Sequence, residues 1–342
     1  MRARRTKAKQ KGFVVVLVLS MVGLLAVLQL GFNYKSRTNL LAAGDFQKSQ
    51  QALNCAKAGL NVAVAAVRNN EDIITNKKLA SLFSDETSFP VGEGNCSVTI
   101  TDEAGKLNVN LLTDKDGKPN RARIDQLLRL IDLLNQQEPG LSNIGYGFVP
   151  AIIDWTDTDD QVVCLPFVKG ENLGAESDYY AGLKPPYRCK NKPLDTSEEL
   201  LLLKGITPEV FNRIRDYVTV NGDGKVSINS APKLVIESLS QELNPALAQI
   251  IIDRRKIKSF DSIMELRDVP GMTDGLYYSI RDMVTVSPAD QYYLVTSRGN
   301  VDPVRRTAFF SNGVNRTSCT ISAVLRKNMQ TKNVDVILYK EL

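Results

Sequence analysis

FVVVLVLSMVGLLAVLQL, residues 13–30, is the longest apolar run of the 342-residue chain and carries no charge. As an α-helix it would be roughly 27 Å long, close to the thickness of a bilayer's hydrocarbon core. Six basic residues and no acidic residue precede it, while Lys35 and Arg37 follow it. The positive-inside rule therefore predicts a single-pass membrane protein with a cytoplasmic N-terminus and the remaining chain on the far side of the membrane.

The composition excludes several classes of function. Six basic residues within 1–12 account for the formal charge of +5, and without them the chain carries −1. A nearly neutral body lacks the positive surface that binds phosphate backbones, so we expect no nucleic acid as a partner. The chain contains no histidine, which excludes catalysis and metal binding that use an imidazole. We expect a protein that is not an enzyme.

The junction Lys11-Gly12-Phe13 is similar to a type IV prepilin signal, which a dedicated peptidase cuts after the glycine. An ordinary signal peptide would be cut after the apolar run, but residues 28–32 offer a poor cleavage site. The resemblance implies a leader over residues 1–12, cleavage between Gly12 and Phe13, and N-methylation of Phe13. The alternative is a simple signal anchor.

Helix-compatible sequence without proline continues well beyond the membrane segment. Phe46, Leu53, Leu60 and Val67 recur every seven residues, a spacing that keeps one face of a helix apolar. We therefore expect one helix over residues 13–70, half in the membrane and half packed on a globular domain. The alternative is an anchor followed by a separate amphipathic helix.

The fifth residue of the expected mature chain, counted from Phe13, is Leu17. Typical pilins carry at this position a Glu that is thought to pair with the N-terminal amine of a neighbouring subunit. An unpaired carboxylate in lipid is costly, so a subunit without it suits the tip of a filament, where no neighbour lies above.

Strand signals lie on both sides of a long helical region. Alternating stretches at residues 95–102 and 106–111 predict a β-hairpin around the turn Glu103-Ala104-Gly105. Further strands are expected at residues 291–297, 307–310, 319–326 and 334–339.

These signals predict an α+β fold of the pilin type, in which a long N-terminal helix packs on an antiparallel sheet. Residues 71–112 and 287–342 would form the α/β unit around the sheet. Residues 113–286, in which helix signals dominate, would form a large all-α insert.

The sequence of the insert predicts where several of its helices begin. Thr196 with Glu199 has the pattern of a capping box, and Thr207 and Asn244 each precede a proline at the first position of a helix. The joints at residues 203–207 and 269–273 resemble the turn of a helix-hairpin-helix motif.

Such hairpins give an alternative hypothesis, a membrane-tethered DNA receptor. DNA-binding hairpins expose backbone amides to phosphate through two glycines. Here Thr207 and Thr273 replace the second glycine, and Glu209 and Asp274 would repel phosphate. We interpret the hairpins as packing elements.

The five cysteines include no CxxC pair, which argues against a zinc ribbon or redox motif. Cys164 and Cys189 flank a polar stretch rich in Gly and Pro, which a disulfide would stabilise in an oxidising compartment. We take these two as a candidate disulfide and expect Cys55 and Cys319 to be small buried residues.

Acidic residues are concentrated at 154–160 (DWTDTDD) and 174–180 (GAESDYY). So many carboxylates repel one another unless they are solvated or bridged by a cation, and Ca²⁺ prefers loops rich in oxygen. The alternative is a solvated loop whose Asp side chains cap helices and turns.

The order of several short segments is similar to that of the minor pseudopilin K (GspK) family of type II secretion. The segments are Gly12-Phe13 with its non-acidic fifth residue, 102–110 (DEAGKLNVN), 154–157 (DWTD), 174–176 (GAE), 185–187 (PPY), and 193–195 (PLD) leading into 198–200 (EEL).

This resemblance implies a pilin-like fold with a helical insert that contains helix-hairpin-helix and SAM-like elements. It implies a place at the pseudopilus tip, where the protein initiates or caps assembly with I- and J-type minor pseudopilins and supports export of folded proteins across the outer membrane. Prepilin peptidase and the inner-membrane secretion platform would be further partners. The chain would be anchored in the bacterial inner membrane with a periplasmic C-terminal domain; a minor pilin of a type IV pilus is the alternative.

The resemblance also implies calcium bound in the insert. We carry it over only to the acidic cluster. The candidate ligands are Asp157, Asp159, Asp160, Glu176 and Asp178.

Overall fold

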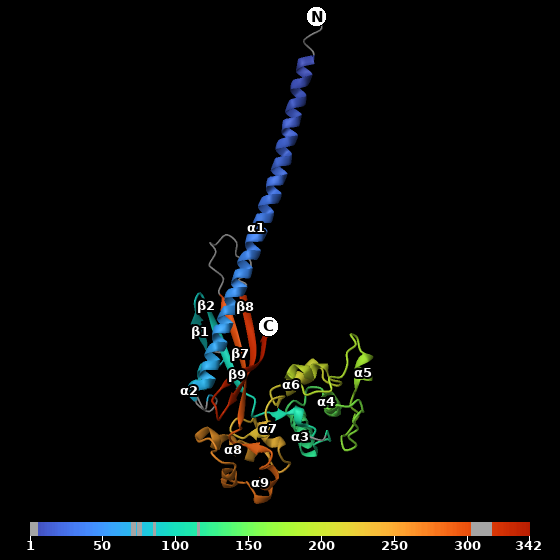
Figure 1. Ribbon diagram of the computed structural model, residues 1–342, viewed down its shortest axis with the longest axis vertical. Coiled ribbons are helices and arrows are strands. Elements are labelled where there is room, and N and C mark those ends of the chain that lie inside the picture. Colours follow the sequence, from blue (N-terminus) through green and yellow to red (C-terminus); the bar gives the residue numbers. More distant parts are fainter. Residues whose placement is uncertain (1–5, 70–72, 74–76, 85–86, 115–116, 302–316) are drawn as a thin grey trace.

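The computed structural model describes residues 6–69, 73, 77–84, 87–114, 117–301 and 317–342. A long helix, α1 (Thr6–Asn69), packs with its C-terminal half on a five-stranded antiparallel sheet, and a mainly helical insert lies beyond the far end of the sheet (Figure 1). Within the described chain, α1 is the one helix long and apolar enough to cross a membrane, and its apolar segment is exposed. The predicted fold class, with one unbroken helix, is confirmed.

The sheet has the order β1-β2-β7-β8-β9. Its strands are β1 (Ser88–Val91), β2 (Gly94–Asp102), β7 (Asp290–Val301), β8 (Thr317–Asn328) and β9 (Val334–Glu341). Three of the four predicted C-terminal strands are present, and the fourth, at residues 307–310, lies outside the described residues. The chain leaves the sheet after β2 and returns at β7, which pairs with β2.

The predicted hairpin at residues 95–111 is wrong. Leu107 and Asn108 form β3 (Leu107–Asn108), which pairs in parallel with β4 (Val218–Thr219) inside the insert, while β2 turns back on β1. Both residues of this strand are buried, and its partner lies more than a hundred residues away along the chain.

The contact between α1 and the sheet is very close. Leu60 and Val67 of the predicted apolar face are buried, but Phe46 is 67% exposed because contact with the sheet begins only near Ala52. A Cβ on Gly299 of β7 would lie 2.0 Å from the carbonyl oxygen of Ala52. Only a residue without a side chain allows the helix to lie this near to β7.

The insert is built from short helices and two short parallel strand pairs. Its elements are β3, η1 (Val109–Leu111), α3 (Arg121–Gln137), α4 (Phe148–Thr156), α5 (Ser177–Ala181), η2 (Ser197–Leu202), α6 (Pro208–Ile214), β4, β5 (Val226–Ser227), α7 (Lys233–Ser238), α8 (Pro245–Ile257), η3 (Ile263–Asp268), α9 (Asp274–Ile280) and β6 (Val284–Thr285). Two apolar cores divide it into a first unit up to β4 and a second unit from β5 to β6, with Leu234 of α7 packed into the first core.

The two units repeat one structure. In each, a 3₁₀ helix leads into a tight turn, a seven-residue helix and a short strand: η2, α6 and β4 in the first, η3, α9 and β6 in the second. Gly205 and Gly271 occupy the same place in the two turns, with φ of +84° and +93°. Thr207 and Thr273 cap the helices that follow.

An asparagine makes the same hydrogen bonds in both units. Asn110 donates to the carbonyl oxygens of Leu194 and Val220, both at 2.9 Å, and accepts from the amide of Leu194. Asn229 donates to the carbonyls of Phe260 and Val286 and accepts from the amide of Phe260. Each asparagine thus joins three segments of its unit. The insert therefore contains an internal structural repeat.

The hairpin turns resemble helix-hairpin-helix turns but lie against other parts of the insert. A Cβ on Gly205 would contact Phe148 of α4 at 3.4 Å, and one on Gly271 would contact Leu247 of α8 at 3.5 Å. The predicted caps at Thr207 and Asn244 are confirmed. Thr196 precedes η2 without a side-chain cap.

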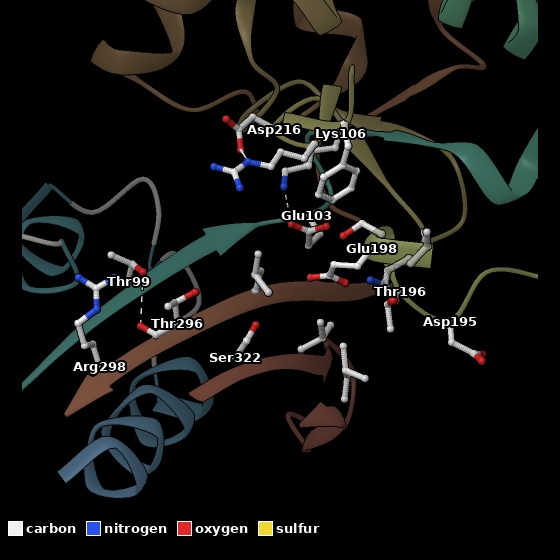
Figure 2. Close-up of a pocket in the computed structure, with 18 residues that line it drawn as sticks. Thr99, Glu103, Lys106, Asp195, Thr196, Glu198, Asp216, Thr296, Arg298 and Ser322 are labelled. Carbon is white, nitrogen blue, oxygen red and sulfur yellow. Dashed lines mark hydrogen bonds and ion pairs between the residues drawn. The ribbon is translucent and has the colours of Figure 1, made fainter. Parts of the chain in front are cut away.

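The insert meets the sheet around a cavity of about 450 Å³, on the sheet face opposite α1 (Figure 2). Glu103 and Lys106 form a buried ion pair of 2.7 Å at this junction. Lys340 of β9 and Glu198 of η2 form a second, partly exposed pair of 3.0 Å. The sheet side carries the hydroxyl groups of Thr99, Thr296 and Ser322. The junction is thus mainly polar, unlike the three apolar cores.

Candidate metal centre

Three carboxylates converge between the end of α4 and the start of α5. Asp154 lies in the last turn of α4, Asp157 directly follows that helix and Glu176 precedes α5. All nine residues of α4 are buried, since its apolar sequence lies inside the core of the first unit. One oxygen atom from each of the three carboxylates lies within 4.8 Å of the others.

The three side chains are almost fully inaccessible, with exposed fractions of 0% for Asp154, 8% for Asp157 and 4% for Glu176. Their buried oxygens Asp154 Oδ2, Asp157 Oδ1, Glu176 Oε1 and Glu176 Oε2 have no hydrogen-bond partner. The backbone amide of Val163 donates to the other oxygen of Asp154 at 2.9 Å. Buried polar atoms in folded proteins nearly always have partners, so these oxygens point to a ligand between them.

Burial raises the pKa of each carboxyl because the charged form loses hydration. The pKa of Asp154 rises to about 6, and those of Asp157 and Glu176 rise to about 7. Neighbouring carboxylates raise the pKa of Asp157 and Glu176 further. Backbone amides and Lys204 offset part of the rise at Asp154. Three carboxylates in this setting need a cation to stay ionised together.

The donor set suits a hard divalent cation. It consists of carboxylate oxygens from two loops and one helix end, which is the chemistry that Ca²⁺ prefers. The cluster could therefore hold a metal ion through Asp154, Asp157 and Glu176. Such an ion would pull the end of α4 and the start of α5 together.

Gly174 lets the second loop approach the first. A Cβ at this position would lie 2.0 Å from Asp154 Oδ2. We expect Gly174→Ala to displace the Asp154 carboxylate and to weaken Ca²⁺ binding about tenfold or more, as changes around metal ligands commonly do. Calorimetric titration of the detergent-extracted full chain with Ca²⁺ measures this loss.

Gly182→Ala is the matched control. Gly182 has φ of −78°, which suits alanine, and an added Cβ would make an ordinary 3.4 Å contact. This variant should bind Ca²⁺ as the wild type does. Equal affinity of the two variants would show that the approach of Gly174 to Asp154 is unimportant for the ion.

The structure brings together two of the five ligand candidates, Asp157 and Glu176. Asp159, Asp160 and Asp178 are exposed. Asp159 accepts a hydrogen bond from the amide of Gln161, and Asp160 accepts from Ser177 and Asn191. These two aspartates do what the solvated-loop interpretation expects, because they satisfy donors in the surrounding turns.

Asp154 is the member of the cluster that sequence reasoning missed as a ligand. It lies in a strongly apolar segment, and its spacing of three residues from Asp157 places both carboxylates on one side of the helix end. A lone carboxylate within an apolar helix is costly to bury. That combination was the signal that could have identified it.

The five cysteines are free thiols in this structure, and the candidate disulfide between Cys164 and Cys189 stays a prediction. Cys164 is exposed, whereas Cys189 is buried and its thiol donates to the carbonyl oxygen of Asp154 at 3.4 Å. Burial raises the pKa of Cys189 to about 12. The thiol of Cys189 therefore faces the acidic cluster.

Aromatic rings pack against one another beside the acidic cluster. Trp155 packs edge-on against Tyr180 with ring centres 5.1 Å apart, and Tyr180 stacks on Tyr187 at 5.2 Å. The hydroxyl of Tyr187 donates to the carbonyl of Leu202 at 2.6 Å. These contacts tie α4, α5 and η2 together around the three carboxylates.

Comparisons with known proteins agree with this architecture. A family model described as "Type II secretion system (T2SS), protein K" matches residues 105–223, which include the acidic cluster. Type II secretion system protein K of Aeromonas hydrophila is 22% identical over 77% of each chain, and that of Pseudomonas aeruginosa is 25% identical over 74% of each. The crystal structure of the GspK-GspI-GspJ complex from enterotoxigenic Escherichia coli contains a chain with a TM-score of 0.58 and 16% identity, covering 90% of this chain and 99% of that one.

A long apolar helix on an antiparallel sheet, with an insert between β2 and β7, is the fold that this chain shares with the chain in the GspK-GspI-GspJ complex, and the helix is long and apolar enough to cross a membrane. The chain is similar to the type II secretion system protein K family, through the family model over residues 105–223 and through relatives that match about three quarters of its length. The proteins to which it is similar are structural, non-enzymatic pseudopilins.

Proposed function

We propose that this protein is the minor pseudopilin at the tip of a type II secretion pseudopilus. There it initiates or caps assembly with other minor pseudopilins and supports the export of folded proteins across the outer membrane. The observation that carries this proposal is the place of the insert, which extends the body at the end farthest from the N-terminus of α1 (Figure 1).

This placement restricts where the subunit fits in a filament. Pilin-type subunits align their N-terminal helices along the filament axis, so their bodies stack with the far end of each directed toward the next subunit above. A body whose far end carries the whole region between β2 and β7 occupies the space of that next subunit. The same insert is harmless at the top, where nothing follows.

Leu17 supports the same position. A tip subunit has no neighbour above it whose amine needs a carboxylate, and a Glu in the apolar segment would then stay unpaired in lipid. The family's partners follow from the relative in the GspK-GspI-GspJ complex, and we propose I- and J-type minor pseudopilins as the direct neighbours of this chain.

The proposed orientation places residues 1–12 in the cytoplasm and everything beyond the apolar segment in the periplasm. Prepilin peptidase and the inner-membrane secretion platform would then act on the N-terminal part. We further propose that the cation of the acidic cluster is Ca²⁺, held by Asp154, Asp157 and Glu176.

Labelling of assembled pseudopili tests the tip position. A short tag after the exposed C-terminal residue Leu342 should be detected by immunogold electron microscopy at one end of each filament. A tag on the major pseudopilin, which should label the whole shaft, is the control. Labels of the tagged chain distributed along the shaft would contradict the proposal.

Processing of the leader can be tested separately. We expect the membrane-extracted protein to begin at Phe13 and to carry one methyl group on its amine, and we expect Gly12→Leu to retain residues 1–12. Intact-mass spectrometry measures both. Gly23→Leu is the control, since a side chain there meets nothing within 4 Å. A mature chain that begins at Met1, or after residue 30, would contradict the prepilin interpretation.

A further inference from the structure

Three of the five cysteines lie at the interface between α1 and the sheet. Cys55 is on α1, Cys96 is on β2 and Cys319 is on β8. The strand register pairs both Cys96 and Cys319 with Gly299 of β7. Residues directly opposite one another on neighbouring strands project to the same face, so both thiols lie on the side of the sheet that α1 covers.

Contacts across this interface bring Cys55 close to Cys96. A Cβ on Gly299, the strand neighbour of Cys96, would lie 2.9 Å from the Cβ of Cys55. A Cβ on Gly94, two residues before Cys96, would lie 2.9 Å from Cys55 Sγ. A Cβ on Gly59, one helical turn after Cys55, would lie 3.2 Å from Cys96 Sγ. Each thiol thus fits beside a glycine of the opposite element.

Electrostatics support this proximity. Burial raises the pKa of both thiols, and the charge of Cys55 raises the pKa of Cys96 further. Cys319 instead influences Tyr339 of β9 and is only half-buried. Of the two cysteines beside Gly299, Cys96 is therefore the better partner for Cys55.

We propose that Cys55 and Cys96 form a disulfide that joins α1 to β2 after the body has been exported. Disulfides need Cα atoms within about 7 Å of each other, and three glycines at this interface allow helix and strand to approach closely. In the reduced structure Cys55 Sγ contacts the carbonyl of Val91 at 3.5 Å, and the new bond would replace this weak contact.

The inference rests on the proposed periplasmic location of the body, because the reaction needs an oxidising compartment. The oxidant is the disulfide of a thiol–disulfide exchange protein. The thiolate of Cys55 attacks one sulfur of that disulfide and releases the other as a thiol; the thiolate of Cys96 then attacks the mixed disulfide at the Cys55 sulfur and releases the second thiol. Both cysteines lose their protons, and the exchange protein gains two electrons.

The order of events follows from burial. In the folded protein Cys55 is 4% exposed and Cys96 is 0% exposed, so an exchange protein cannot reach them. The bond must therefore form before α1 settles on the sheet. The disulfide then links α1 covalently to β2 when the subunit is pulled from the membrane. The other contacts between α1 and the sheet are noncovalent.

Peptide mapping tests the bond directly. The full chain is extracted from membranes in detergent with an alkylating agent present, then unfolded and digested with trypsin without reductant. Each cysteine of the interface lies in its own peptide, at residues 49–57, 79–106 and 317–326. We expect the first two peptides to be joined, lighter by two hydrogens than their sum, and Cys319 to be alkylated. Alkylation of both Cys55 and Cys96, or a Cys55–Cys319 link, would overturn the proposal.

Two variants and one further measurement complete the test. Cys319→Ser should keep the link, and Cys96→Ser should abolish it and lower the melting temperature by about 5–10 °C, the size expected for losing a loop-closing disulfide. Protease added outside spheroplasts reports whether the body is exported. If protease cuts the body and both thiols are free, the disulfide proposal is contradicted and the proposed pseudopilin function is unaffected. If the body is protected from protease, both the disulfide and the proposed function are contradicted.

Discussion

Ca²⁺ should raise the melting temperature of the wild-type protein, and Asp154→Asn should abolish this rise. A ligand present at a hundred times its dissociation constant stabilises the state that binds it by about 2.7 kcal/mol, which corresponds to a rise of about 5–10 °C. The asparagine keeps the size of the side chain and an oxygen for the amide of Val163. It removes one of three negative charges that the cation needs. Thermal denaturation followed by circular dichroism, with and without a chelator, measures the effect.

Without the cation, the same substitution should stabilise the folded protein relative to wild type. The buried Asp154 has a pKa of about 6 instead of 3.8, so keeping it ionised costs the folded state about 2–3 kcal/mol at pH 8. We expect chelator-treated Asp154→Asn to melt at a higher temperature than chelator-treated wild type at this pH. A variant that is less stable than wild type both with and without Ca²⁺ would show that Asp154 has only a packing role.

The same pKa values predict how the metal-free protein responds to pH. Because the folded-state pKa values of Asp154, Asp157 and Glu176 are raised to about 6–7, the folded protein binds more protons than the unfolded chain between about pH 4 and 7. Its free energy of unfolding should fall as the pH rises through this window. Saturating Ca²⁺ should remove the fall, since the ion favours the ionised carboxylates.

Asp178→Asn is the control for the cluster. Asp178 belongs to the ligand set suggested by the family resemblance, but it is exposed in the first turn of α5. The Asp178→Asn variant should keep the wild-type rise in melting temperature with Ca²⁺ and the wild-type dependence of the free energy of unfolding on pH. Loss of the Ca²⁺ response in this variant, with the response kept in Asp154→Asn, would move the ion to the exposed part of the loop.

Gly299→Val should destabilise the unit formed by α1 and the sheet by about 3 kcal/mol or more, at the upper end of overpacking costs. A Cβ there would lie 2.0 Å from the carbonyl oxygen of Ala52 and 2.6 Å from the amide nitrogen of Ala56. Both atoms belong to the helix backbone, so relief requires all of α1 to move away from β7. Thermal denaturation of the detergent-extracted chain measures the loss.

Arg298→Val is the matched control. Arg298 precedes Gly299 on β7 but projects to the opposite face of the sheet, where it is exposed beside the cavity (Figure 2). The same side chain placed one residue away should change the melting temperature by no more than a degree or two, in the range of ordinary surface substitutions. Equal losses in both variants would locate the sensitivity in β7 itself instead of in its contact with α1.

The parts of the fold that sequence reasoning identified depend on local chemistry. Thr207 and Asn244 cap helices because each offers an oxygen to amides two or three residues ahead, and a proline follows each. The apolar segment at residues 13–30 is recognised from its length and lack of charge alone, without knowing which residues contact it. Such signals are complete within a few residues.

The errors concern partners that lie far apart along the chain. Leu107 alternates like a hairpin strand, but whether it pairs with β2 or with Val218 depends on how the insert folds. Phe46 continues the apolar spacing of α1, yet the sheet ends before it. Periodicity indicates which residues share a face and leaves open what covers that face.

For the same reason, the sequence predicted only Asp157 and Glu176 among the three carboxylates of the candidate metal centre. Asp157, Asp159 and Asp160 are equivalent by composition, and only the burial imposed by α4 separates the first from the other two. Asp154 is hidden in the sequence among apolar residues, and Glu176 joins it from another loop. Convergence of three carboxylates is a property of the folded first unit.

The pairing of β2 with β7 also sets an order of folding. Asp102 lies opposite Tyr293, and the whole insert separates the two strands along the chain. Closing so long a loop in an unfolded chain is slow, whereas each unit of the insert has its own apolar core and shorter loops. The insert should therefore form first and hold the ends of β2 and β7 side by side. Hydrogen exchange during refolding should then show protection in α4 and α8 before β7, with α1 docking last.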